Sequence, residues 1–297
     1  MRIFITGATG FLGKHILDIC IRKKFQILAL TRKKNIFKNS KNVRWICADL
    51  SDVKFITKEI NSFRPDTVIH LAWENIPDFS AEICLKNHYN SVNLLDNIIK
   101  SNHLKKIICP GSCREYSDRT GSCKETDIIQ PTSFFTRAKI SLHEYLKQKS
   151  LKNKIDYYWF RIFFLYGPGQ RGGSIIPSIV NSFKNNTTPI IFNPFNKNDF
   201  IFVRDAAQMM LQPLLSKIRP GIYNIGTGKA TSVIKVCSII EKIFFNTNKF
   251  TKSLYGKKNA NQQVSYFADT DKMIKNLKIT NLTKIETGIN DYIKNSS

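Results

Sequence analysis

Three glycines directly after the first apolar segment constrain the fold most. Arg2–Thr6 has the pattern of a short β-strand, and Gly7–Gly13 follows it with the spacing G-x-x-G-x-x-G. In such a turn one glycine permits the sharp bend, one lets a pyrophosphate approach the backbone, and one lets the next helix pack against the strand. The free N–H groups and the dipole of that helix would face the phosphates. We therefore expect a dinucleotide site at the start of the chain.

The end of the second predicted strand bears on which dinucleotide binds. In NAD-binding turns an acidic residue about 20 positions beyond the glycines contacts the ribose 2′-OH. Here the sequence reads Thr31-Arg32-Lys33-Lys34. A hydroxyl followed by cations suits a 2′-phosphate. We predict NADP(H) rather than NAD(H); the alternative is that these cations belong to the general surface charge.

Strand and helix patterns alternate over the first two hundred residues. The predicted strands are Arg2–Thr6, Gln26–Leu30, Val43–Cys47, Thr67–His70, Lys106–Cys109 and Asp156–Ile162. Between them, helical spacing of apolar residues is found over Leu12–Lys23, Val53–Phe63 and Asn90–Ser101. This alternation predicts an α/β protein with a Rossmann-type, doubly wound parallel sheet.

A second, smaller lobe is expected after Tyr166, where glycines punctuate a loop over residues 167–173. A helix is predicted over Ile175–Phe183, and strands over Phe200–Val203 and Gly221–Ile225. We predict an NADP-binding Rossmann domain over residues 1–165, to which residues 199–225 return. The C-terminal α+β substrate lobe would comprise residues 166–198 and 226–297.

Composition argues against several classes of function. No apolar run approaches the roughly 20 residues that cross a bilayer, and no signal-peptide pattern opens the chain, so we expect a cytoplasmic protein without membrane partners. The seven cysteines are scattered without C-x-x-C spacing, which argues against a disulfide framework and a metal site. The formal charge of +24 is spread along the chain. We interpret it as solvated surface; nucleic-acid binding, the alternative, predicts affinity that falls steeply with salt.

Ordered motif matches to one enzyme family run along almost the entire chain. They are Thr6–Gly13, Ala48–Leu50, His70–Ala72, Asn87, Asn93–Leu95, Gly111–Tyr116, Pro131–Lys139, Arg161–Gly169, Asp199–Phe200, Val203, Asp205 and Tyr223–Gly226. In these segments the chain resembles the extended short-chain dehydrogenase/reductase family, specifically its nucleotide-sugar epimerases, dehydratases and 4-keto-reductases. The resemblance implies a nucleoside-diphosphate sugar as substrate and a homodimer paired through helices that include Thr136–Lys149.

The resemblance, together with the glycine turn, gives a set of cofactor contacts. Asp49 and Leu50 would contact the adenine, and Leu71, Ala72 and Lys139 the nicotinamide side. The full cofactor-binding set is Gly7, Thr9, Gly10, Phe11, Leu12, Gly13, Thr31, Arg32, Lys33, Asp49, Leu50, Leu71, Ala72, Trp73, Asn87, Lys139, Ile162 and Phe163.

The substrate contacts implied by the resemblance depart from the family at two positions. Phe164 stands where many relatives have an asparagine, and Asn198 precedes Asp199 where an arginine to the diphosphate is usual. A cation nearby could replace that arginine. The candidate substrate-binding residues are Ser112, Cys113, Tyr116, Phe164, Arg171, Lys197 and Arg204.

The catalytic pair of the family is incomplete. Relatives carry a tyrosine four residues before a lysine on one helix; the lysine lowers the phenol pKa and the phenol exchanges a proton with the sugar oxygen. Lys139 is present and Ser112 would bind the reacting oxygen, but Phe135 replaces the tyrosine and has no ionisable proton. Tyr145 and Lys149 repeat the spacing roughly 15 Å further along the helix, so we interpret that pair as unrelated to catalysis.

Phe135 leaves three interpretations. The proton could come from Tyr116, Ser112, Cys113 or a bound water; the protein could bind cofactor and sugar nucleotide without reacting them; or Phe135 could be an engineered replacement of tyrosine. Under the first, we predict NADPH-dependent reduction at C4 of a nucleoside-diphosphate 4-keto-6-deoxyhexose, in the biosynthesis of a surface-polysaccharide sugar, with Tyr116 as substitute donor. The strand end Gly111–Tyr116 resembles that branch of the family.

Two alternatives to the reductase stay open. An epimerase or dehydratase of the same family is one, although a dehydratase usually has an acidic residue next to the serine and Cys113 stands there. A non-catalytic NADP(H)-binding protein is the other.

Overall fold

The computed structural model describes residues 1–33, 39–101, 103–116, 120–255, 265–277, 279 and 281–295. Lys34, one of the cations expected to favour NADP(H), lies outside them. The chain forms two compact units. The first comprises residues 1–117, 128–161 and 210–223, and the second comprises residues 118–127, 162–209 and 224–297.

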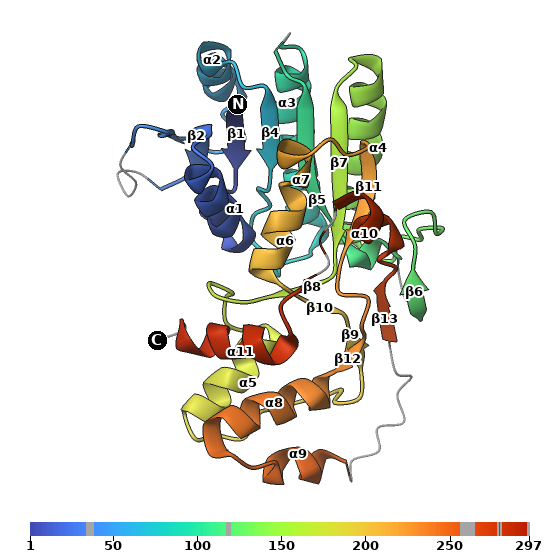
Figure 1. Ribbon diagram of the computed structural model, residues 1–297. Helices are drawn as coiled ribbons and strands as arrows, with labels where there is room; N and C mark the ends of the chain where they lie inside the picture. The colour runs from blue at the N-terminus through green and yellow to red at the C-terminus, as the bar shows by residue number, and fades with distance from the viewer. Residues whose placement is uncertain are drawn as a thin grey trace. The chain divides into compact units, whose positions relative to one another are not determined.

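A seven-stranded sheet with the order β11-β7-β5-β4-β1-β2-β3 organises the first unit (Figure 1). Its strands are β1 (Arg2–Thr6), β2 (Gln26–Thr31), β3 (Val43–Cys47), β4 (Thr67–His70), β5 (Lys106–Ser112), β7 (Asp156–Ile162) and β11 (Gly221–Ile225). The pairs β1/β2, β2/β3, β1/β4 and β4/β5 are parallel. The predicted Rossmann-type sheet is confirmed, and the strand order reverses next to β1, where this fold binds its ligand.

Helices cover both faces of this sheet because successive strand residues point to opposite sides. The helices of the unit are α1 (Phe11–Arg22), α2 (Val53–Phe63), α3 (Ala81–Ile99), α4 (Phe134–Lys152) and the short α7 (Gln212–Leu215), with a 3₁₀ turn over Cys113–Tyr116. Phe4, Leu28 and Val68 share one core with α2, α3 and α4. Figure 1 shows α1 on the opposite face.

The start of α3 differs from the sequence prediction. The helix begins at Ala81, nine residues before the expected Asn90. Its inner face buries Asn87, Asn90 and Ser91, so polar residues interrupt the apolar spacing that marks a helix in sequence. Strand β5 likewise continues beyond Cys109 and ends at Ser112, which places the predicted catalytic serine at a strand terminus.

The second unit combines small sheets with helices. Its strands are β6 (Gly121–Cys123), β8 (Phe164–Tyr166), β9 (Lys197–Asn198), β10 (Phe200–Phe202), β12 (Thr231–Ser232) and β13 (Ser265–Ala268). Its helices are α5 (Ile175–Lys184), α6 (Val203–Met210), α8 (Val233–Phe245), α9 (Lys249–Leu254), α10 (Asp271–Leu277) and α11 (Ile285–Lys294). Residues of α5, α8 and α11 share one apolar core with β8 and β10. Among the residues described, no helix has the length and apolar character that a membrane crossing requires.

Candidate functional site

The glycine turn after β1 has the close contacts that its spacing predicts. Gly7 adopts φ +68°, and a Cβ there would lie 2.8 Å from the backbone nitrogen of Ala72. A Cβ on Gly13 would lie 2.0 Å from the Gly7 carbonyl oxygen, so α1 packs against the turn at a distance only glycine allows. The first turn of α1 carries no acidic residue. Its positive end is therefore open to a phosphate.

Gly13→Ala is expected to deform this turn. The added methyl would displace the Gly7 carbonyl, and overpacking of this kind costs about 1–3 kcal/mol. We expect weaker binding of NADPH, measured by calorimetry, and a lower melting temperature. Gly172→Ala is the matched control, because a Cβ at Gly172 meets nothing within 4 Å. If the Gly13 variant binds NADPH with unchanged affinity, the turn does not contribute to cofactor binding.

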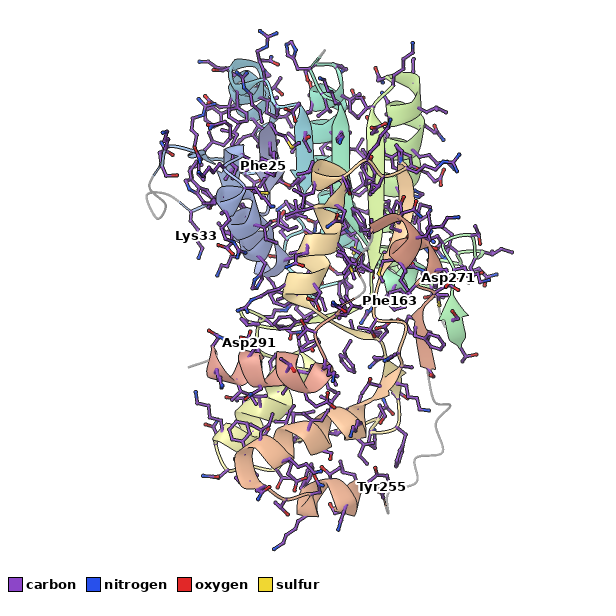
Figure 2. The ribbon with its side chains drawn as sticks, in the orientation of Figure 1. Phe25, Lys33, Phe163, Tyr255, Asp271 and Asp291 are labelled. Atoms are coloured by element: carbon purple, nitrogen blue, oxygen red, sulfur yellow. The ribbon has the colours of Figure 1, made fainter. Side chains whose placement is uncertain are left out.

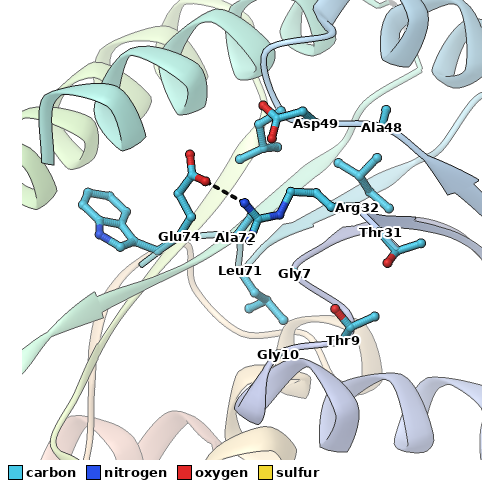
Figure 3. A pocket seen from close by; sticks show the side chains of 13 residues that line it. Gly7, Thr9, Gly10, Thr31, Arg32, Ala48, Asp49, Leu71, Ala72 and Glu74 are labelled. Atoms are coloured by element: carbon cyan, nitrogen blue, oxygen red, sulfur yellow. Dashed lines mark hydrogen bonds and ion pairs between the residues drawn. The ribbon is translucent and has the colours of Figure 1, made fainter. Parts of the chain in front are cut away.

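A cavity opens at the carboxyl ends of β1, β2, β3 and β4 (Figure 3). Ten of the predicted cofactor contacts line it: Gly7, Thr9, Gly10, Thr31, Arg32, Asp49, Leu50, Leu71, Ala72 and Trp73. Leu30, Ala48 and Glu74 also line it and were not predicted. The other predicted cofactor contacts are not among its lining residues: Phe11, Leu12, Gly13, Lys33, Asn87, Lys139, Ile162 and Phe163.

The end of β2 brings a cation into this cavity. The Arg32 guanidinium donates to the Glu74 carboxylate at 2.7 Å, as the dashed line in Figure 3 shows. The Thr31 hydroxyl accepts the backbone N–H of Lys33 at 3.1 Å, and Lys33 itself is exposed (Figure 2). Of the three predicted residues at this strand end, Thr31 and Arg32 line the cavity, and Arg32 bonds to Glu74 after β4.

Asp49, which follows β3, lines the same cavity as a pre-organised carboxylate. Its Oδ1 accepts both the backbone N–H and the hydroxyl of Ser51, at 3.0 and 2.8 Å. The backbone hydrogen bond from Ser51 is the main reason why the pKa of Asp49 is lowered, and burial opposes it. A carboxylate held in this way is an acceptor suited to an adenine amino group.

A buried histidine fixes the end of β4. His70 Nδ1 lies 2.9 Å from the Thr6 hydroxyl, which in turn accepts the backbone N–H of Ala72 at 3.2 Å. His70 Nε2 lies 3.0 Å from the Ser91 hydroxyl. Burial, with a smaller contribution from Lys139, lowers the pKa of His70 to about 3. The neutral imidazole thus supports the Leu71–Ala72 wall of the cavity.

Lys139 lies on the buried face of α4, beside an aromatic cluster. Its ammonium donates to the Pro110 carbonyl at 3.1 Å and lies 4.1 Å from the centre of the Trp73 ring. Burial lowers its pKa to about 8. Phe135, one helical turn earlier, packs against Trp73 at 5.5 Å and Phe79 at 4.8 Å between ring centres. The position of the missing tyrosine is therefore filled by an apolar contact.

The predicted Ser112 and Tyr116 belong to a hydrogen-bonded turn at the end of β5. The Ser112 hydroxyl accepts the Arg114 N–H at 3.2 Å, so its own hydrogen can be donated. The Tyr116 hydroxyl accepts from the Arg161 guanidinium at 3.0 Å, and its side chain is 1% exposed. The Tyr116 hydroxyl is thus buried beside a cation, and its role as the substitute proton donor stays a prediction. Cys113 is buried as well.

A buried carboxylate holds this turn together. Glu115 is fully buried and accepts from the Ser112 N–H at 2.8 Å, the Trp159 indole at 3.1 Å and Arg161 Nε at 2.8 Å. A Cβ on Gly111 would lie 2.5 Å from this carboxylate, so the glycine leaves room for it. Sequence reasoning gave Glu115 no role, because an acidic residue in a motif shows nothing of its burial. The structure indicates a positioning residue beneath Ser112.

The second Y-x-x-x-K pair has a structural explanation. The Tyr145 hydroxyl donates to Asp96 Oδ1 at 2.6 Å, and the Lys149 ammonium lies 2.5 Å from the same oxygen. Asp96 is on α3, so both side chains connect α4 to α3. This agrees with the interpretation that the pair is not catalytic.

The remaining predicted substrate contacts lie in the second unit. Arg171 and Lys197 are exposed, and Phe164 packs against Phe200 at 6.0 Å between ring centres. Arg204 pairs at 3.2 Å with Asp291 of α11, which Figure 2 labels. Its charge is thus partly neutralised within the unit. The substrate roles of these residues stay predictions.

Comparisons with known proteins agree with the family predicted from the sequence motifs. The model of the NAD dependent epimerase/dehydratase family matches residues 3–226. A putative UDP-glucose 4-epimerase of Methanocaldococcus jannaschii is 30% identical over 80% of this chain and 81% of its own length. The dTDP-4-dehydro-6-deoxyglucose reductase of Escherichia coli is 25% identical over 83% of this chain and 82% of its own.

Solved structures show the same fold. A UDP-glucose 4-epimerase of Thermotoga maritima, solved with UDP-glucose, superposes with a TM-score of 0.85 over 100% of this chain and 98% of its own, at 20% identity. Together with the matched family model and the Rossmann-type sheet, these relatives show that the chain belongs to the NAD-dependent epimerase/dehydratase family of nucleotide-sugar enzymes.

Proposed function

We propose that the protein reduces the C4 keto group of a nucleoside-diphosphate 4-keto-6-deoxyhexose with NADPH, in the making of a surface-polysaccharide sugar. The observation that carries this proposal is the grouping of Lys139, Trp73 and Ser112 at the ends of β4 and β5, next to a glycine turn suited to a dinucleotide. The Escherichia coli relative, named for the reduction of a 4-keto-6-deoxysugar, supports the same substrate class.

The residues present fit a dinucleotide, and their charge favours NADP(H). The cradle between Gly7 and Gly13 leaves no space for a Cβ, and the first turn of α1 is free of acidic residues. Strand β2 ends on Thr31 without the acidic residue that would accept a ribose 2′-OH. Arg32 instead offers a fork of donors suited to a 2′-phosphate.

The side chains around Phe135 suggest how the reaction proceeds without a tyrosine. The bound cofactor supplies the hydride to C4. The Ser112 hydroxyl donates a hydrogen bond to the C4 oxygen, while Glu115 holds the backbone of Ser112 in place. Lys139 is then the proton source, because burial lowers its pKa to about 8 and brings its acidity close to neutral pH. The proton reaches the sugar oxygen through Ser112 or a water molecule.

This role of Lys139 predicts a pH dependence. The lowered pKa means that the ammonium is protonated below about pH 8 and loses its proton above it. We expect kcat/KM for reduction to be constant from pH 6 to about 7.5 and to fall about tenfold for each further pH unit above about 8. Lys139→Arg, whose guanidinium does not give up a proton, should lower kcat/KM at every pH and remove this decline. A flat profile for the unaltered protein up to pH 10 would exclude Lys139 as the acid.

The proposed reaction is tested by NADPH absorbance with a panel of nucleotide 4-keto-6-deoxysugars. Oxidation of NADPH with formation of the C4 alcohol supports it. The second candidate is epimerisation, favoured by the 30% identical putative epimerase, and it predicts interconversion of two nucleotide sugars without net use of NADPH. Tight cofactor binding with no turnover, unchanged by Phe135→Tyr, would indicate a non-catalytic NADP(H)-binding protein.

The predicted homodimer rests on the helix pair α3 and α4. Leu85 and Tyr89 on α3 are 66% and 67% exposed, which supports an apolar contact between copies at this face.

A further inference from the structure

Glu74 joins two cations at the edge of the cofactor cavity. Its Oε2 accepts from Arg32 at 2.7 Å, and its Oε1 lies 3.1 Å from the Lys86 ammonium. The Glu74 side chain is 12% exposed, whereas those of Arg32 and Lys86 are 59% and 52% exposed. The carboxylate is thus the enclosed member of the group, and the two cations pair with different oxygens of it.

The side chain of Asn87 holds the backbone of Glu74 in place. Its N–H donates to Asn87 Oδ1 at 2.8 Å, and its carbonyl accepts from Asn87 Nδ2 at 3.2 Å. Asn87 is buried on α3 and also donates to the Ile83 carbonyl at 2.9 Å. The predicted cofactor contact Asn87 therefore has both polar atoms engaged in holding this loop. With its backbone held in this way, Glu74 can move its carboxylate only by rotation of its own side chain.

Arg32 is also the side chain on which the proposed preference for NADP(H) depends. In the structure its guanidinium is committed to Glu74 across the cavity (Figure 3). A 2′-phosphate carries close to two negative charges and would approach the same guanidinium. The phosphate and the Glu74 carboxylate therefore compete for one cation, and they repel one another.

We propose that Glu74 is a specificity-determining residue that works as a counter-ion latch: it holds Arg32 until a 2′-phosphate takes the guanidinium over, and Lys86 then stays behind to neutralise the carboxylate. This inference rests on the proposed use of NADP(H). A cofactor without the 2′-phosphate does not need the Arg32 guanidinium to leave Glu74. We therefore expect Glu74 and Lys86 to change the affinity for NADP(H) and to leave the affinity for NAD(H) unchanged.

Two fragments that differ only in the 2′-phosphate test the proposal without any turnover. Calorimetry would compare adenosine 2′,5′-bisphosphate with adenosine 5′-monophosphate. Glu74→Gln should tighten the bisphosphate by roughly three- to tenfold, because removing the competing carboxylate frees Arg32. Lys86→Met should weaken the bisphosphate, because the carboxylate is left with Arg32 as its remaining cation. Both variants should leave the monophosphate within about twofold.

The control is a matched ion pair away from the cavity. Glu59 and Arg44 lie 3.1 Å apart with side chains 22% and 41% exposed, so Glu59→Gln removes a similar carboxylate and should change neither affinity. In an Arg32→Ala background the effect of Glu74→Gln on the bisphosphate should fall below about twofold, because the latch has lost its cation.

Three results would overturn the proposal, and they separate it from the proposed function. If Glu74→Gln weakens the monophosphate, the carboxylate binds the ribose hydroxyls and the site is built for NAD(H). If the bisphosphate binds more tightly than the monophosphate and Glu74→Gln leaves this preference unchanged, the latch is wrong while NADP(H) use stands. If neither fragment binds, the cofactor site itself is wrong.

Discussion

Phe135→Tyr is expected to raise the rate of keto-sugar reduction by about 10²–10⁴-fold, the usual contribution of a positioned general acid. The new phenol would stand one helical turn before Lys139 on the buried face of α4. The ammonium next to it would stabilise the phenolate and so lower the phenol pKa. The measurement is kcat for NADPH oxidation with the nucleotide 4-keto-6-deoxysugar that gives the highest basal rate.

Tyr145→Phe is the matched control, because it removes a phenol from the same helix and from the same Y-x-x-x-K spacing. Its hydroxyl is bound to Asp96, so the rate should not change. Adding Lys139→Met to the Phe135→Tyr variant should abolish most of the gain. If Phe135→Tyr changes kcat by less than about threefold while NADPH still binds, the missing phenol is not what limits this protein.

Glu115→Gln is expected to lower the free energy of unfolding by about 3–5 kcal/mol, because it removes the carboxylate that pairs with the buried Arg161 guanidinium. The two side chains are 0% and 2% exposed and lie 2.8 Å apart. Glutamine has almost the same shape as glutamate, so the loss would come from charge rather than packing. Urea unfolding followed by circular dichroism gives the measurement.

An exposed pair serves as the comparison. Asp18 and Arg22 form an ion pair on α1 with side chains 63% and 68% exposed, and Asp18→Asn should cost no more than about 0.5 kcal/mol. Combining Glu115→Gln with Arg161→Met should recover part of the lost stability, since the buried charge that Glu115 neutralised is then removed as well. A loss below about 1 kcal/mol for Glu115→Gln alone would show that Arg161 finds another partner.

The sheet and the glycine turn could be predicted from sequence because both depend on neighbouring residues. The strands Arg2–Thr6, Val43–Cys47, Thr67–His70 and Asp156–Ile162 are confirmed with the predicted bounds. A parallel strand buried on both faces shows an apolar run, and a glycine needed for close packing can be read from its spacing. Ten of the predicted cofactor contacts line one cavity for a related reason, since parallel strands end at the same edge of the sheet.

The roles of Glu74 and Glu115 could not be predicted in the same way. Each carboxylate pairs with a cation far along the chain: Arg32 lies 42 positions before Glu74, and Arg161 lies 46 positions after Glu115. The residues next to an acidic residue in the sequence do not show whether its carboxylate is buried or pairs with a cation. The contact of Tyr116 with Arg161 could not be predicted either, because Arg161 comes from β7, far along the chain.

Trp73 gives the protein an optical reporter of its own. The indole lines the cavity, faces the Lys139 ammonium at 4.1 Å and meets Phe135 edge-on. Indole emission overlaps the near-ultraviolet absorption of a reduced nicotinamide, so a dinucleotide seated beside this ring would quench its fluorescence by energy transfer. Occupancy can therefore be followed in the unlabelled protein by light alone, before any substrate is known.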